Sequence, residues 1–208
     1  LALAPNTEIF LVSKTKGPTK TKGIEIVANT SFSECPQVDI ILVPGGAGIN
    51  DVLEDEEYTN FLVNQGKGAK YITSVCTGSL LLAAAGLLDG YKATTHWLSL
   101  SVLEAFGIET VKERVVVDRN RITGGGVTAG IDFGLRLVSE IFGPKIAKQI
   151  QLHIEYNPDP PFNCGSPDTA DKEIVEEVSA AFEKVVKERT EKMQTIKKRR
   201  EKTGVNPQ

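Results

Sequence analysis

Short β-branched runs alternate with helical patterns along most of this sequence, and this alternation constrains the fold more than any other feature. We expect strands over residues 8–13, 23–28, 38–43, 69–75, 92–95, 115–118 and 121–123. We expect helices over residues 51–64, 77–85, 98–106, 128–142 and 144–156. Strands that alternate with helices predict an α/β fold with a doubly wound, mostly parallel sheet and helices on both faces.

One cysteine lies on a turn where a predicted strand becomes a predicted helix. Residues 74–79 (SVCTGS) stand between an apolar run and an Ala/Leu-rich run, as a nucleophile elbow would. Unpaired backbone N–H groups and the positive end of the helix dipole at such a turn favour a thiolate. Cys76 is therefore a candidate nucleophile, and the alternative is a small apolar side chain packed under the sheet.

Composition limits the partners that the chain can have. The 24 Lys and Arg residues against 27 Asp and Glu residues give a net charge of -3, so no overall basic field favours nucleic acid or an acidic membrane. We expect a small-molecule substrate, no nucleic-acid partner and no membrane partner. Neither a signal peptide nor a spanning apolar segment is evident, and the three cysteines have no metal-ligand spacing and no disulfide framework. These features favour a reducing compartment and a cytoplasmic location.

The length favours one compact domain with a tail. Residues 1–170 carry the alternating pattern, and residues 171–208 carry an amphipathic helix that we expect to pack on the same domain or on a dimer partner. The apolar stripe of this helix contains Ile174, Val175, Val178, Phe182, Val185 and Val186. Residues 197–200 form a basic run whose positive charge is offset by neighbouring glutamates, and we interpret it as a solvated helix end.

A glycine-rich loop, residues 44–48 (PGGAG), follows the strongest predicted strand. Open α/β sheets place their ligands at this carboxyl edge. Backbone N–H groups at Gly46 and Ala47, together with that of Thr77, would stabilise negative charge during thiolate addition. Without the cysteine turn, the loop would read as a tight turn that needs positive φ.

Histidines and the remaining cysteines have less specific contexts. His96 ends the predicted strand that follows the cysteine helix, and reads equally as a substrate contact or as a structural residue. His153 and Asp132 lie inside helical patterns and read as structural. Cys35 and Cys164 lie outside any strand-to-helix turn, so we expect both to be non-catalytic.

Seven short motifs together resemble one family. They are residues 43–46 (VPGG), 74–78 (SVCTG), 93–97 (ATTHW), 123–132 (TGGGVTAGID), 151–156 (QLHIEY), 160–162 (PPF) and 165–167 (GSP). With these motifs the chain resembles the ThiJ/PfpI superfamily of class I amidotransferase-like α/β proteins, and within it the isocyanide hydratases. The likeness extends over nearly the whole chain to about residue 170.

The resemblance implies a reaction and a site. Cys76 would be the nucleophile that adds to the isocyanide carbon, and a thioimidate would then be hydrated to an N-substituted formamide. Thr77 would contribute to the site, and Gly125 and Val127 would lie beside the nucleophile. The resemblance implies no cofactor and no metal, and it implies a homodimer.

Two departures qualify the resemblance. The family carries its acid/base carboxylate after the first strand, whereas this chain opens at residues 1–6, which match the end of the family's first helix. We therefore expect the acid upstream of residue 1. Peptidase-like members of the superfamily have histidine directly after the cysteine. This chain has Thr77 at that position, so we do not expect it to be a peptidase. Two alternatives stay open: a ligand-sensing domain related to AraC-type regulators, and a cysteine-based stress or redox protein.

Overall fold

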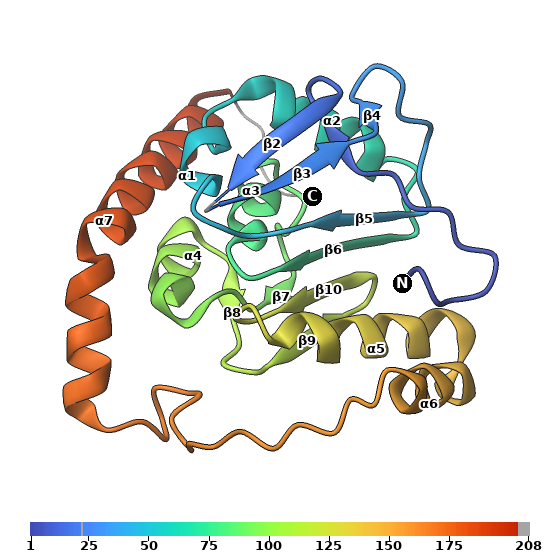
Figure 1. Cartoon of the computed structure of the whole chain (residues 1–208). Coiled ribbons are helices and arrows are strands. Elements are labelled where there is room, and N and C mark those ends of the chain that lie inside the picture. The colour runs from blue at the N-terminus through green and yellow to red at the C-terminus, as the bar shows by residue number, and fades with distance from the viewer. Residues whose placement is uncertain (22, 204–208) are drawn as a thin grey trace.

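The computed structural model describes residues 1–21 and 23–203, which form an α/β fold around a four-stranded sheet (Figure 1). The strand order is β5 (Ile40–Val43), β6 (Tyr71–Val75), β10 (Arg121–Gly124) and β9 (Val115–Asp118). The first three strands are parallel, and β9 forms an antiparallel hairpin with β10. The predicted α/β class is confirmed.

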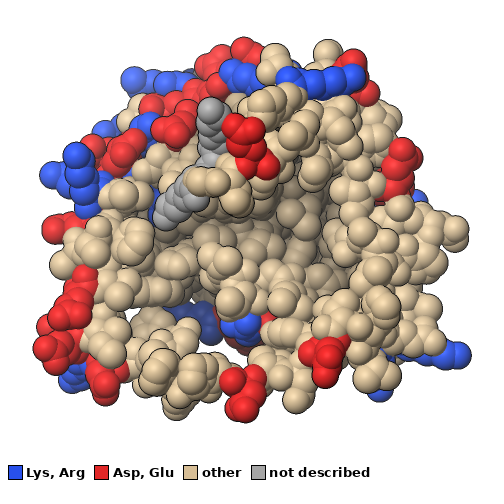
Figure 2. All heavy atoms as spheres, viewed as in Figure 1, with Lys and Arg blue, Asp and Glu red and all other residues tan. Residues whose placement is uncertain are grey.

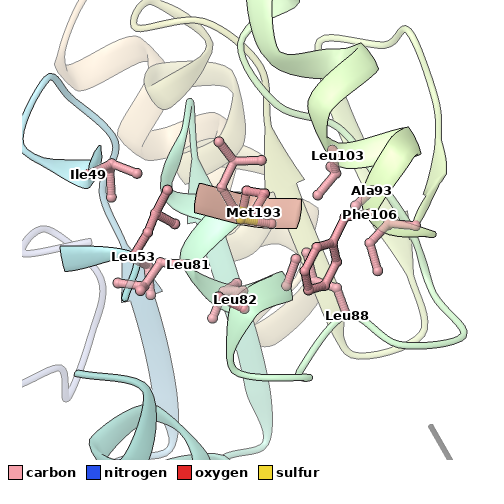
Figure 3. Close-up of a cluster of buried hydrophobic side chains, with 14 of the residues drawn as sticks. Ile49, Leu53, Leu81, Leu82, Leu88, Ala93, Leu103, Phe106 and Met193 are labelled. Atoms are coloured by element: carbon pink, nitrogen blue, oxygen red, sulfur yellow. The ribbon is translucent and has the colours of Figure 1, made fainter. Parts of the chain in front are cut away.

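Helices cover both faces of this sheet. Helix α3 (Gly78–Ala84) packs on one face beside α2 (Glu56–Gly66) and α4 (Leu100–Phe106), and all of its residues are buried. Its leucines form the main apolar core with side chains from α1 (Ile49–Val52) and α4 (Figure 3). On the other face, α5 (Ala129–Phe142) buries Phe133 and Leu137, which are one helical turn apart, against Ile122 of β10. Helix α6 (Pro144–His153) packs on the outside of α5.

Three smaller strand pairs flank the central sheet. They are β1 (Val12–Ser13) with β4 (Thr30–Ser31), β2 (Gly17–Thr21) with β3 (Ile24–Ala28), and β7 (Lys92–Ala93) with β8 (Glu109–Thr110). The strand predicted over residues 8–13 is wrong in length, because only its last two residues pair. The backbone at Leu11 instead bonds to the side chain and N–H of Asn29.

The helix predicted over residues 51–64 is also divided in two. Helix α1 ends at Val52, and α2 begins after Asp55, whose carboxylate accepts a hydrogen bond from the N–H of Glu57. Such a capping contact starts a new helix, so the single predicted helix is two helices, and Asp55 is the N-cap of the second.

Helix α7 (Lys172–Thr203) runs along one side of the molecule and is reached by a segment that crosses from α6 (Figure 1). It contacts α1, α3, α4 and η1 (Trp97–Ser99). Its firm packing comes from Met193 and Ile196, whereas Ile174 and Phe182 of the predicted stripe are exposed. The other four residues of the predicted stripe, Val175, Val178, Val185 and Val186, are half-buried, and Val186 packs against the main core. The boundary at residue 170 stays a prediction, and residues 204–208 of the predicted tail lie outside the described residues.

The strand ends set the place of the site. The carboxyl ends of β5 and β6 point toward α1, α4 and α7 (Figure 1). Figure 2 shows the molecule from the same side as Figure 1, with most charged side chains at the rim of the view and a hollowed, mostly uncharged centre. Within the described residues, no helix combines the length and the apolar character needed to cross a membrane.

Candidate active site

Cys76 occupies the turn between β6 and α3 with a backbone φ of 58°. Its N–H donates to the carbonyl oxygens of Gly124 and Gly125, at 2.9 and 2.8 Å, and its own carbonyl accepts from Thr95 Oγ1 at 3.0 Å. A left-handed residue other than glycine costs about 1–2 kcal/mol, and this network of bonds holds it in place. The result is a partly exposed thiol on a fixed turn at the carboxyl edge of the sheet.

Thr77 fixes the glycine loop beside the cysteine. Its side chain is buried, and Oγ1 accepts a hydrogen bond from the N–H of Gly46 at 3.1 Å. The same hydroxyl lies 3.4 Å from the carbonyl oxygen of Gly46, to which it can donate. Thr77 is the N-cap residue of α3 but makes no side-chain capping bond. The hydroxyl therefore joins two loops rather than capping the helix.

Gly45 packs closely against the backbone of Thr77. A Cβ on Gly45 would lie 2.5 Å from the nitrogen of Thr77 and 2.7 Å from Cβ of Cys76. Among the hydrogen bonds of the described residues, the N–H groups of Thr77 and Ala47 have no acceptor, whereas the N–H of Gly46 is engaged by Thr77. The Thr77 amide is therefore the buried donor next to the thiol. The N–H of Gly46 is bonded to the Thr77 hydroxyl, and its predicted part in stabilising negative charge stays a prediction.

The glycine segment after β10 closes the other side of the cysteine. Gly125 accepts from the N–H of Cys76 and donates its own N–H to the carbonyl oxygen of Arg114 at 2.9 Å. A Cβ on Gly126 would lie 3.7 Å from Cδ2 of His96, so this segment also faces the histidine. Val127 is 79% exposed, and within the described residues no polar contact joins it to Cys76. The predicted place of Val127 beside the nucleophile stays a prediction.

The ring of His96 is half-buried. Burial lowers its pKa, and the positive charge of Arg189 lowers it further. Its Nδ1 accepts from the N–H of Leu98 at 3.4 Å, so the proton of the neutral ring belongs on Nε2. His96 can therefore donate a hydrogen bond near neutral pH without carrying charge.

A second polar network supports the glycine segment. Arg114 Nε donates to Oδ2 of Asp132 at 2.5 Å, and the hydroxyl of Tyr156 donates to the same oxygen at 3.0 Å. Arg114 Nη2 also donates to Thr128 Oγ1. This network joins the start of α5 to the loop before β9, next to the carbonyl that Gly125 binds. The carboxylate of Asp132 is thus engaged by two donors.

Two residues near the site were missed by the sequence analysis. Arg189 of α7 is buried and binds Asn50, the second residue of α1. Val185, Arg189 and Met193 follow each other at four-residue spacing, so a charge on the apolar stripe was the available signal.

Among the described residues, no group of three or more His, Cys, Asp or Glu side chains is placed to hold a metal ion. The cysteines 35, 76 and 164 are free thiols. Burial raises the pKa of Cys35, which favours its neutral form, and Cys164 is exposed in the segment before α7.

A pocket of about 150 Å³ lies between Trp97, residues 164–167 and the first turns of α7.

The fold and the positive φ of Cys76 define an α/β protein with a cysteine on a strand-to-helix turn. The sequence model of the DJ-1/PfpI family matches residues 4–140, and the chain belongs to this family. The predicted resemblance is confirmed.

Similar proteins give a narrower comparison. The chain is 48% identical over 192 residues to an isonitrile hydratase of Pseudomonas putida, covering 92% of this chain and 84% of that protein. The crystal structure of a ThiJ/PfpI family protein from Pseudomonas syringae superposes with a TM-score of 0.87 at 43% identity, covering 89% of this chain and 78% of that one. The HTH-type transcriptional regulator GbdR of Pseudomonas aeruginosa is 38% identical over 62% of this chain, which spans only 35% of the regulator.

Proposed function

We propose that this protein hydrates isocyanides to N-substituted formamides, with Cys76 as the nucleophile. The observation that carries the proposal is the 48% identity to an isonitrile hydratase over 92% of the chain. The positive φ of Cys76 supports it, because a strained strand-to-helix turn is what a nucleophile elbow needs to present a reactive side chain.

The chemistry divides a difficult hydration into two steps. The thiolate of Cys76 forms a bond to the terminal carbon of R–N≡C, and that carbon takes up a proton to give the thioimidate Cys–S–CH=N–R. Water then adds to the same carbon and the nitrogen is protonated. Collapse of this tetrahedral species breaks the C–S bond, returns the thiolate and releases R–NH–CHO. The sum is R–N≡C plus water giving the formamide.

The buried amide beside the thiol suits the second step. A tetrahedral intermediate places negative charge on the oxygen derived from water, and the N–H of Thr77 is a fixed donor next to the sulfur. His96 contributes a neutral Nε2–H donor at the same edge of the sheet. Asp132 is not assigned the proton transfer, because Arg114 and Tyr156 already engage its carboxylate.

We propose a small-molecule substrate, which the similarity to an isonitrile hydratase supports. The pocket beside Trp97 has a volume of about 150 Å³ and a mixed lining that includes Pro167, Val175 and Val178. Its lining residue Trp97 directly follows His96, and on this basis we propose that the pocket receives the substituent on the isocyanide nitrogen. We also propose that the protein acts as a cytoplasmic homodimer, without cofactor, metal, nucleic acid or membrane.

The experiment is an assay of the full-length protein with one alkyl and one aryl isocyanide. We expect formamide to appear catalytically, and light scattering should report a dimer. The 38% identity to GbdR supports a second candidate, a ligand-sensing domain. Saturable isocyanide binding without formamide release would favour the sensor, and reversible oxidation of Cys76 without turnover would favour the redox protein.

A further inference from the structure

Asn50 is a buried polar residue that three residues of helix α7 bind. It is 5% exposed, and it lies in α1, two residues after the glycine loop, residues 44–48. Its Oδ1 accepts a hydrogen bond from Arg189 Nε at 2.9 Å, and its Nδ2 donates to the carbonyl oxygen of Val185 at 3.2 Å. Its backbone carbonyl accepts a third bond, from Lys192 Nζ at 2.7 Å. The three partners lie at helical spacing, so one face of α7 holds this single residue of α1.

Helix α1 has little stability of its own. It has only four residues, and its N-cap residue is Gly48, which has no side chain that could cap it. A helix of this length is not stable in isolation, because nucleation fixes several dihedral angles for a single hydrogen bond. Tertiary contacts therefore set its position, and they include the core packing of Ile49 and the bonds between Asn50 and α7.

The glycine loop is bonded both to α1 and to the cysteine turn. The N–H of Ile49 donates to the carbonyl oxygen of Gly46 at 3.4 Å. The N–H of Gly46 donates to Thr77 Oγ1 at 3.1 Å, and Thr77 directly follows Cys76. Gly46 has a φ of 139°, and glycine has more backbone freedom than any other residue, so the loop depends on these neighbours for its shape. A continuous series of contacts thus runs from α7 through Asn50 to the residue after the cysteine.

We propose that Asn50 is a positioning residue through which helix α7 fixes the glycine loop against Thr77. This inference rests on the proposed function only in taking the loop and Cys76 as parts of the reacting site. If Asn50 only stabilised the fold, its loss would lower the free energy of unfolding without a separate effect at Gly46. Positioning instead predicts a local change at the loop that exceeds the change in stability.

Two lysines of α7 provide a matched comparison. Each donates from Nζ to a backbone carbonyl oxygen, Lys192 to Asn50 at 2.7 Å and Lys197 to Ala105 of α4 at 2.9 Å. The first bond reaches the helix that follows the glycine loop, and the second reaches a different helix. Lys192 also pairs with Glu188 on α7, and a partly exposed pair of this kind contributes little to stability.

The test measures hydrogen exchange of the Gly46 amide by NMR in the full-length protein, together with unfolding in urea. Lys192→Met should accelerate this exchange about five- to tenfold, the effect of losing one hydrogen bond that holds the loop. Lys197→Met should lower stability to a similar extent and leave the exchange of Gly46 unchanged. Asn50→Ala removes both side-chain bonds and should have a larger effect than Lys192→Met. Lys192→Arg keeps a donor at this position and should restore slow exchange.

Catalysis provides a second readout. In Lys192→Met, kcat for formamide release should fall about tenfold and KM should change by less than about twofold, because a fixed loop that acts in the transition state affects kcat. Lys197→Met should keep the full rate. Unchanged exchange of Gly46 in Lys192→Met and in any folded Asn50→Ala would overturn the proposal, as would faster exchange with the full kcat retained. If the unsubstituted protein releases no formamide, the proposed function fails, and the exchange of Gly46 alone decides the role of Asn50.

Discussion

Gly45 and Thr77 approach each other so closely that a Cβ atom on Gly45 would lie 2.5 Å from the backbone nitrogen of Thr77. Only a residue without a side chain allows this approach, so Gly45 packs directly on the backbone of the cysteine turn. Gly78 makes a similar approach on the other side of Thr77, where an added Cβ would lie 2.1 Å from the carbonyl oxygen of Val43. The cysteine turn is thus packed between glycines that cannot be enlarged without moving backbone.

Gly45→Ala should reduce both stability and turnover. The added methyl group meets backbone rather than a flexible side chain, so overpacking should cost about 1–3 kcal/mol in urea unfolding. Gly48→Ala is the matched control in the same loop, since a Cβ there meets nothing within 4 Å. Equal effects of the two substitutions would contradict the close approach.

Thr77→Val should slow formamide release by about ten- to a thousandfold, the range of one positioned polar group. The change removes the hydroxyl that bonds Gly46 while keeping a similar shape. Thr77→Ser keeps the hydroxyl and should retain most of the rate. A Thr77→Val enzyme with an unchanged rate would show that this bond does not position the loop for catalysis.

Cys76→Gly should be about 1 kcal/mol more stable than Cys76→Ala, because glycine removes the cost of a Cβ at φ 58°. Thermal unfolding of the two inactive variants gives the difference. If Cys76→Ala proved the more stable of the two, the turn would not be strained.

Stability should fall as the pH falls below about 6.5, the ordinary pKa of the histidine side chain. Burial and the charge of Arg189 lower the pKa of His96 in the folded protein, so the unfolded chain takes up a proton first in this window. His96→Gln should flatten this part of the pH profile. His153→Gln is the control, because His153 is exposed at the end of α6. A slope that survives in His96→Gln would assign the pH dependence to other groups.

Local pattern was sufficient for the α/β class and for the turn that carries Cys76. The run before Cys76 folds as β6 and the Ala/Leu run after it folds as α3. Both runs consist mainly of residues that are readily buried. Pattern failed where a side chain competes with regular structure. Asp55 divides one predicted helix, and the Asn29 side chain binds the backbone that a longer β1 would have paired.

Long-range contacts explain what the sequence could not predict at the site. The glycine loop was predicted to offer the N–H of Gly46, but the Thr77 hydroxyl, 31 positions away, occupies it. Arg189 reaches Asn50 across 139 positions, and the periodicity of α7 marks only that this arginine lies on an apolar stripe. Which helix meets which strand end depends on tertiary packing, so the contact between Arg189 and Asn50 could not be predicted from the sequence.

The central claim is that Cys76 alone among the cysteines performs the chemistry. The most direct measurement is the rate of formamide release from an isocyanide by the full-length protein, compared with its Cys76→Ala and Cys164→Ala variants. Cys76→Ala should lose all detectable turnover, and Cys164→Ala should keep the full rate, because only Cys76 lies on the strained strand-to-helix turn. Full formamide release by the Cys76→Ala variant would contradict the account.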